Sequence, residues 1–372
     1  MKREVFIDYA RAIMIFWVVF HHIVSVDVVT HSMYFAMPAF FLITGYMHVR
    51  KKDTLSNLIY KKIKNLLLPF WSLMFFSGLV EIFRGSYFGY ADYKTVISTT
   101  LVYMFYGSPN LPKLNFLTKF IKMPTYVDFG EKSIDVMLPL NCHLWFFVAM
   151  FVGSILFYIY LEKIRKQDWH DFIMIFICLL IACVDVVLGF QLPYCLSIGG
   201  YACACMIVGY RFKQRDVFKI NTRHSIACVI CVALYIAFLI SGQTDIYLNM
   251  SFYGSYGTAS VFASFLYGIS GTYLLFYLMK LLESIAPNIE VLKYFGQRTL
   301  VLYIWHLYVC TLVYFIMAIV FKMTPEISDY GVNVIPNDRL DLKLIAFVAT
   351  IFLCTPIIDK IRSKLKKTRL VA

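Results

Sequence analysis

Charged side chains are scarce in this chain. Asp, Glu, Lys and Arg together make up 15% of its 372 residues, whereas hydrophobic residues make up 60% and aromatic residues 18%. About a quarter of the residues in an ordinary soluble domain are charged. The composition therefore excludes the common soluble classes and indicates a polytopic membrane protein.

The sequence also lacks a tandem repeat, a low-complexity linker, a separate soluble domain and the ligand spacing of a zinc or haem site. Most of the ten cysteines lie inside apolar runs, where cysteine serves as a small apolar residue. Cys142 and Cys195 instead lie near the expected outer ends of such runs, where an oxidising compartment would allow a disulfide. We expect no metal site.

Apolar runs of about 17 to 23 residues are long enough to cross a bilayer as helices. We predict about ten such spans, with boundaries uncertain by several residues. They fall at 11–30, 33–49, 65–83, 144–161, 172–190, 193–210, 225–241, 259–280, 299–321 and 343–359. The predicted fold class is all-α, a polytopic transmembrane helical bundle forming one integral-membrane domain over 1–372.

The placement of Lys and Arg orients the predicted bundle, because short cytoplasmic loops are enriched in basic residues. With both termini in the cytoplasm, most of the 35 basic residues fall on that side. We therefore interpret the formal net charge of +13 as a sign of topology and of attraction to the lipid bilayer. Nucleic acid is not an expected partner.

One long segment, at about 84–143, is predicted to lie on the outer face as a loop, lid or acceptor site. Within it, the apolar run 96–106 is too short to span a membrane, which suggests an interfacial or re-entrant piece. A second outer segment is predicted at 322–342.

Three ionisable residues, Asp8, Arg11 and His22, share the first apolar run. At about 100° per residue, Arg11 and His22 lie within roughly 20° of each other, and Asp8 lies about 60° from Arg11. His21 lies about 80° from Arg11 on the opposite side from His22, and so about 100° from His22. Ionisable groups are costly inside a membrane, so a polar stripe of this kind indicates a functional site.

The chemistry of the stripe suits acyl transfer. A largely neutral His22 can accept a proton from a hydroxyl and return it. Arg11 can hold a phosphate or pyrophosphate, and Asp8 can orient its guanidinium. The structural alternative is an ion pair that anchors the helix end at the lipid headgroups, with a core histidine bonded to a carbonyl.

Several motifs then follow in a recognisable order. The first helix, IDYARAIMIFWVVFHH, resembles that of the membrane acyltransferase-3 family, in which an Arg is followed by ten residues and a His. Arg11 and His22 have this spacing. Weaker similarities to the same family lie in AFFLITGYM at 39–47, YKKIKNLLLPFW at 60–71, HLWFFVAMF at 143–151 and GQRTLVLYIWHLYV at 296–309.

The resemblance implies an integral-membrane O-acyltransferase that takes an acyl group, usually acetyl, from cytoplasmic acyl-CoA and places it on a glycan hydroxyl. His22 would deprotonate the acceptor or be acylated transiently, and the sequence leaves both routes open. The expected acceptor is a surface or capsular polysaccharide or its lipid-linked precursor. The expected location is a bacterial inner membrane.

Further residues are assigned on the same basis. Lys61 and Lys64 would attract the anionic donor, although many family members have arginines in this segment and a basic cytoplasmic loop is expected from topology alone. His306 would bind the donor or tune His22, or simply pack in the core. His143 and Trp145 would seat the acceptor sugar, or anchor the helix at the interface.

Three other histidines, His21, His31 and His48, are interpreted as structural.

A transporter or flippase of lipid-linked glycan is the alternative function, because membrane bundles with buried His and Arg also form transport pathways. No inverted repeat is visible, and the ionisable groups gather on one helix, which favours the enzyme.

Substitutions can test the prediction that His22, and not His21, lies on the same face of the helix as Arg11. We expect His22→Ala to abolish acyl transfer while the protein still inserts, Arg11→Lys to weaken use of the donor, and His21→Ala to have a milder effect. Acyl transfer by membranes carrying each variant at matched expression provides the measurement. Equal losses at His21 and His22 would contradict the predicted facing.

Overall fold

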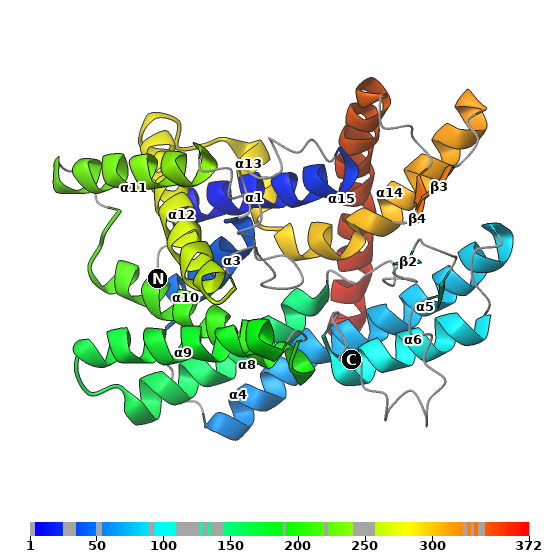
Figure 1. Cartoon of the computed structure of the whole chain (residues 1–372). Coiled ribbons are helices and arrows are strands. Elements are labelled where there is room, and N and C mark those ends of the chain that lie inside the picture. The colour runs from blue at the N-terminus through cyan, green and yellow to red at the C-terminus, as the bar shows by residue number, and fades with distance from the viewer. Residues whose placement is uncertain are drawn as a thin grey trace. The chain divides into compact units, whose positions relative to one another are not determined.

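The computed structural model describes residues 4–24, 35–49, 54–88, 93–108, 127–128, 133–134, 144–188, 191–218, 222–240, 257–322, 326–328, 331–333 and 339–371. The described elements are helices apart from four short strands (Figure 1). The chain packs into two compact units. The first comprises Met1–Met33, Gly130–Ile134 and Met279–Ala372, and the second comprises Tyr34–Phe129 and Asp135–Leu278.

The all-α polytopic class is confirmed. Seven helical stretches among the described residues are long and apolar enough to cross a membrane: Val5–Ile23, Leu55–Phe83, Trp145–Ile164, Trp169–Leu188, Pro193–Gln214, Ala259–Ile285 and Thr299–Phe321. The other three predicted spans also coincide with helices, which are α3 (Ala36–Tyr46), α11 (Thr222–Ile240) and α15 (Leu340–Val371). The number of ten spans stays a prediction, as does the side on which the termini lie.

Helix α1 (Val5–Ile23) begins six residues before the predicted span 11–30, so Asp8 lies on the same helix as Arg11 and His22. Its first turns are covered by protein: Phe6, Ile7 and Tyr9 are almost completely buried. Of the predicted span 11–30, residues 25–30 lie outside the described residues.

The first unit is built around α1. Its other elements are the end of α12 (Ala259–Ile285), α13 (Glu290–Gly296), α14 (Thr299–Phe321), α15, β2 (Ser133–Ile134), β3 (Glu326–Ser328) and β4 (Gly331–Asn333). Helix α1 packs against α13, α14 and α15, and α14 packs against α15 (Figure 1). Strands β3 and β4 pair antiparallel within the segment predicted to lie on the outer face.

Hydrogen bonds fix the beginning of α1. The backbone N–H of Val5 donates to Glu283 over 3.1 Å, so a carboxylate from α12 accepts one of the N–H groups that a helix start leaves without a partner. The Tyr9 hydroxyl donates to the carbonyl of Ala286 over 3.0 Å and accepts from the N–H of Ile289 over 2.8 Å. The connection between α12 and α13 is thereby attached to α1.

A glycine brings α13 against α1. A Cβ atom at Gly296 would stand 1.9 Å from the carbonyl oxygen of Asp8, so the two backbones touch there without an intervening side chain. About two turns further along α1, Phe16 packs edge-on against Phe295 with ring centroids 4.8 Å apart.

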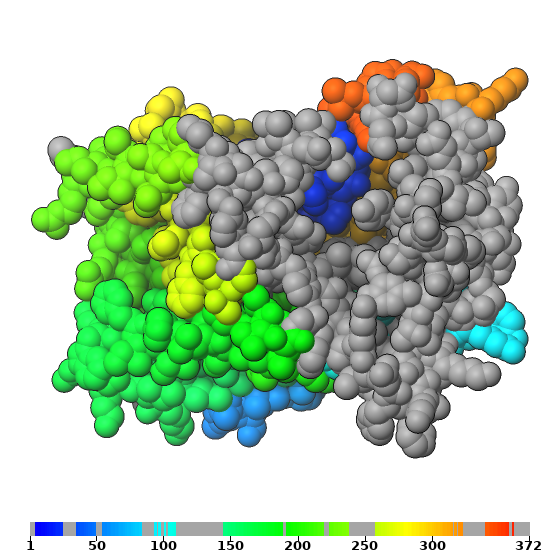
Figure 2. All heavy atoms as spheres, in the orientation of Figure 1, coloured from blue at the N-terminus to red at the C-terminus, as the bar shows by residue number. Residues whose placement is uncertain are grey.

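The second unit holds most of the remaining helices. Its elements are α3, α4 (Leu55–Lys62), η1 (Ile63–Leu67), α5 (Leu68–Phe88), α6 (Tyr93–Tyr106), β1 (Val127–Asp128), α8 (Trp145–Ile159), η3 (Tyr160–Ile164), α9 (Trp169–Leu188), η4 (Pro193–Cys195), α10 (Leu196–Gln214), α11 and most of α12. Helix α10 packs against α3, α8 and α9. In Figure 2 the green atoms of α8 to α10 form one continuous surface.

The short helix α3 depends on glycines for its position. A Cβ at Gly45 would stand 1.9 Å from the carbonyl oxygen of Met206, and one at Gly209 would stand 2.0 Å from that of Leu42. The backbones of α3 and α10 therefore touch at two places. Protein contacts cover α3, whose residues Phe41, Leu42 and Ile43 are buried.

Part of the segment predicted as an outer loop at 84–143 is helical. Helix α6 runs back along α5, since Trp71 Nε1 donates to the carbonyl of Met104 over 3.1 Å and Gly78 lies against Thr100. The apolar run predicted to be interfacial or re-entrant thus forms most of a 14-residue helix.

The end of α6 meets the turn between α9 and α10. Ser108 donates to the carbonyl of Leu192 and accepts from the N–H of Cys195, each over 2.7 Å. Tyr194 and Cys195 both have positive φ angles, 55° and 49°, which are unusual for residues with a side chain. Asp185 supports this turn by accepting from the N–H of Leu192 and from the Ser197 hydroxyl, over 2.9 and 2.6 Å.

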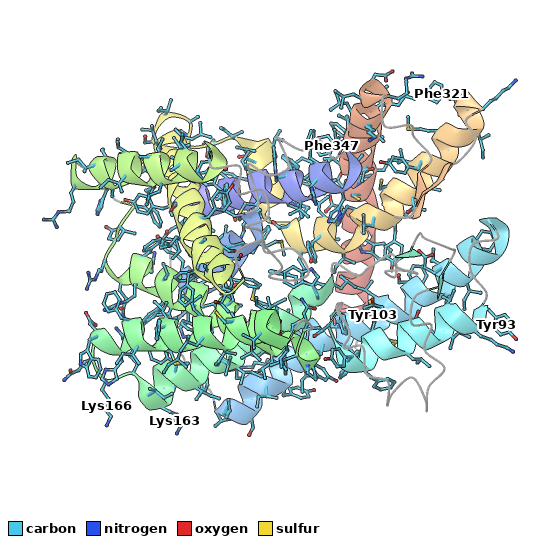
Figure 3. All side chains as sticks on the ribbon, in the orientation of Figure 1. Tyr93, Tyr103, Lys163, Lys166, Phe321 and Phe347 are labelled. Atoms are coloured by element: carbon cyan, nitrogen blue, oxygen red, sulfur yellow. The ribbon has the colours of Figure 1, made fainter. Side chains whose placement is uncertain are left out.

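The opposite end of α10 carries an ion-pair network. Buried Asp171 accepts from the Tyr160 hydroxyl and pairs with Arg165 and Arg211, over 3.0 and 2.5 Å. The hydrogen bond from Arg211 to exposed Asp168 holds the pKa of that carboxyl below its usual range. The nearby Lys163 and Lys166 point away from the helices, as Figure 3 shows. This end matches the basic segments predicted to be cytoplasmic.

We expect Gly296→Ala to destabilise the protein, because its new methyl group meets the backbone of α1 rather than a movable side chain. Overpacking of this kind costs about 1–3 kcal/mol or more. Thermal unfolding of the detergent-solubilised protein provides the measurement. The control is Gly257→Ala, where a Cβ meets nothing within 4 Å and only the positive φ of 56° opposes the substitution. Equal losses of stability would contradict a special role for the α1–α13 contact.

Candidate functional site

The three ionisable residues predicted to form a polar stripe lie on the one continuous helix α1. Asp8 is 3% exposed and lies where Gly296 meets the helix. Arg11, one turn later, is half-buried. Because α13 fixes the backbone of this turn, the positions of the acidic and basic groups along α1 are set by tertiary contact.

His22 lies in the last turn of α1 and contacts a second histidine. Its ring centroid is 5.2 Å from that of His306 on α14, with 34° between the ring planes. The neighbouring ring of His21 is 5.3 Å from that of His22. The structure therefore brings together His22 and His306, which are 284 positions apart in the sequence, within the first unit.

The two histidines differ in exposure. The side chain of His22 is exposed, whereas His306 is completely buried. An exposed imidazole beside a buried one presents one ring to a ligand and keeps the other inside the protein.

The hydrogen bonds of His306 define its tautomer. Its Nδ1 atom lies 3.0 Å from the carbonyl oxygen of Leu302 and 2.9 Å from that of Tyr303. Carbonyl oxygens only accept, so Nδ1 carries the hydrogen and Nε2 is the nitrogen with the lone pair in the neutral ring. The packing of α14 thus gives this buried histidine a defined proton acceptor.

The two lysines predicted to attract the anionic acyl-CoA donor lie in the second unit. Lys61 on α4 and Lys64 on η1 are exposed, whereas Lys62 between them is half-buried and donates to Ser154 on α8 over 3.0 Å. A π-helical turn, η1, follows directly, and such turns occur frequently at functional sites. The sequence reasoning did not assign a separate role to Lys62, whose signal is only its place in a run of basic residues.

The two residues assigned to the acceptor also belong to the second unit. Trp145 begins α8 and is 4% exposed, so the ring is part of the core. His143 lies outside the described residues, as does His31. Val148, one turn after Trp145, lies against Gly107 at the end of α6.

Several buried ionisable residues among those that the structure describes had no predicted role, and Lys343 is the basic one among them. Lys343 in the first turn of α15 is only 9% exposed. It lies one helical turn before Phe347, labelled in Figure 3, whose ring packs edge-on against Phe20 of α1 at 5.4 Å. The sequence contained a signal for this lysine, since it is the first residue of the predicted span 343–359.

In the part of the chain that the structure describes, no group of three or more His, Cys, Asp or Glu residues could hold a metal ion. The nine described cysteines are free thiols, and seven of them are buried. Cys195 is among these buried thiols, and Cys142 lies outside the described residues.

Comparison with known protein families gives a match over nearly the whole chain. The model of the acyltransferase-3 family, described as an acyltransferase domain, matches residues 4–359 and so includes both compact units. No curated protein and no solved structure matches the chain.

A pair of substitutions at His306 separates a packing role from a chemical one. In His306→Asn the amide can still donate near the position of Nδ1, but the acceptor at Nε2 is lost; His306→Gln places an amide near Nε2. We expect both variants to fold, and His306→Asn to lower acyl transfer at least tenfold and more than His306→Gln does. Transfer rates and thermal unfolding are measured together. Full activity in His306→Asn would show that the histidine only packs.

Proposed function

The chain belongs to the acyltransferase-3 family and is a multi-pass membrane acyltransferase, and from this premise we propose its substrates. The donor is cytoplasmic acyl-CoA, with acetyl-CoA as the expected form. The acceptor is a hydroxyl of a cell-surface polysaccharide or of its lipid-linked precursor. The proposed location is a bacterial inner membrane.

The observation that carries the proposal is the contact between His22 and His306. Acyl transfer to a hydroxyl requires a group that removes the hydroxyl proton as the oxygen attacks the thioester carbon. An imidazole does this near neutral pH. His22 has the exposure that contact with two substrates requires, and its buried neighbour 5.2 Å away has a fixed tautomer.

The proposed reaction balances without a further reactant. A ring nitrogen of His22 accepts the proton of the acceptor hydroxyl, and the oxygen forms a bond to the acyl carbon. The carbon–sulfur bond then breaks, and the CoA thiolate receives the proton from His22. In the alternative route a ring nitrogen of His22 bonds to the acyl carbon and CoA leaves as its thiolate. The acceptor hydroxyl then attacks the acylated His22, the imidazole is regenerated, and the hydroxyl proton goes to the CoA thiolate.

The remaining assigned residues have supporting roles in this proposal. Arg11 binds phosphate or pyrophosphate of the donor through its guanidinium, and buried Asp8 balances and orients that charge. Lys61 and Lys64 attract the anionic donor from exposed positions, and His306 supports His22. His143 and Trp145 are assigned to the acceptor, although the buried ring of Trp145 is not open to stacking on a sugar.

The proposal is tested with the purified full chain in nanodiscs. Radiolabelled acetyl-CoA and a crude surface-glycan extract are supplied, and both free CoA thiol and label in glycan are measured for wild type, His22→Ala and His48→Ala. We expect label in glycan from wild type and from His48→Ala, and no label from His22→Ala.

His48 is a suitable control because its ring packs against Phe157 in the second unit, 5.2 Å between centroids. Release of CoA thiol without label in glycan would support acyl-CoA as the donor and reject a surface glycan as the acceptor. A folded wild type that cleaves no thioester with several acyl-CoA donors would reject the proposal and favour transport of a glycan.

A further inference from the structure

The last turn of α1, Phe20–Val24, contacts two other helices of its unit. The ring of His22 meets that of His306 on α14, and Phe20 meets Phe347 on α15. In addition, the hydroxyl of Tyr314 on α14 donates to the carbonyl oxygen of Ile23 over 3.1 Å. Phe20, His22 and Ile23 in this turn therefore each contact α14 or α15.

A helix end requires such support more than a helix centre does. The final carbonyl groups of a helix have no partner within the helix, and its last turn unwinds readily unless other groups bind them. The Tyr314 hydroxyl supplies a donor to one of these carbonyls directly beside His22. Removing it takes away a hydrogen bond that ties this turn of α1 to α14.

The orientation of this turn decides which histidine meets α14. His21 and His22 differ by about 100° around the helix axis. Rotation of the turn by that amount would bring His21 to the place of His22, so the orientation of the helix end determines the chemistry of the site. A hydrogen bond to the backbone resists rotation better than contacts between rings, because it has a defined direction.

We propose that Tyr314 is a positioning residue, which fixes the last turn of α1 so that His22 rather than His21 faces His306. The expected effect of Tyr314 on turnover rests on the proposed function, whereas its effect on the orientation of His21 and His22 does not. His306 and Tyr314 are separated by about 12 Å along α14. The side chains of His306 and Tyr314 thus contact the same turn of α1 from two different turns of α14.

The test is Tyr314→Phe, which retains the ring and removes only the hydroxyl. We expect kcat for acyl transfer to fall about fivefold, as the loss of one neutral hydrogen bond allows, while KM for the donor changes less than twofold. The matched control is Tyr308→Phe on the same helix, where the ring packs against Trp305. We expect the control to retain the wild-type kcat.

A second measurement does not depend on activity. Diethyl pyrocarbonate modifies accessible histidines, and mass spectrometry gives the ratio of modified His22 to modified His21. We expect modification to favour exposed His22 in wild type and in Tyr308→Phe, and to shift toward His21 in Tyr314→Phe.

The outcomes separate positioning from stability. The proposal is overturned if Tyr314→Phe changes neither kcat nor the ratio of modified His22 to modified His21. It is also overturned if Tyr314→Phe lowers the unfolding temperature while kcat per folded molecule and that ratio stay at their wild-type values. A shifted ratio in a protein whose wild type transfers no acyl group supports positioning while rejecting the proposed function.

Discussion

The backbone of α1 touches that of α13 at Asp8 and Gly296, where no side chain fits between them. This contact sets the distance of α1 from the helices that follow α13 in the chain. Helix α14 begins three residues after Gly296 and carries His306 and Tyr314. The position of His22 against these residues therefore depends on a glycine contact about 21 Å away along α1.

Unpaired polar groups are costly away from water, and each unit pairs several of its polar groups with partners from other segments of the chain. Glu283 accepts from the start of α1, Tyr9 bonds to the connection before α13, and Asp171 is shared by two arginines and a tyrosine. Such fixed polar contacts hold helices in one register. At the end of α1 the side chain of His22 is exposed.

Two histidines in contact divide the requirements of acid–base chemistry between them. The exposed ring of His22 can reach a substrate, whereas the buried ring of His306 has a tautomer fixed by two carbonyl groups. A single exposed histidine would lack a neighbour of defined orientation, and a single buried one would lack access. Membership of an acyltransferase family agrees with this division, because acyl transfer moves one proton twice.

The sequence by itself determined the all-α membrane class, the location of the main helices, and the spacing of Arg11 and His22 on the first helix. These follow from local properties, namely apolar length and helical periodicity. Only the tertiary structure decided that His306 meets His22, that Tyr314 holds Ile23, that Lys62 turns toward Ser154, and that His22 is exposed. Each of these depends on which helix faces which, and distant packing contacts such as Gly296 on Asp8 determine that facing, whereas periodicity within one helix does not.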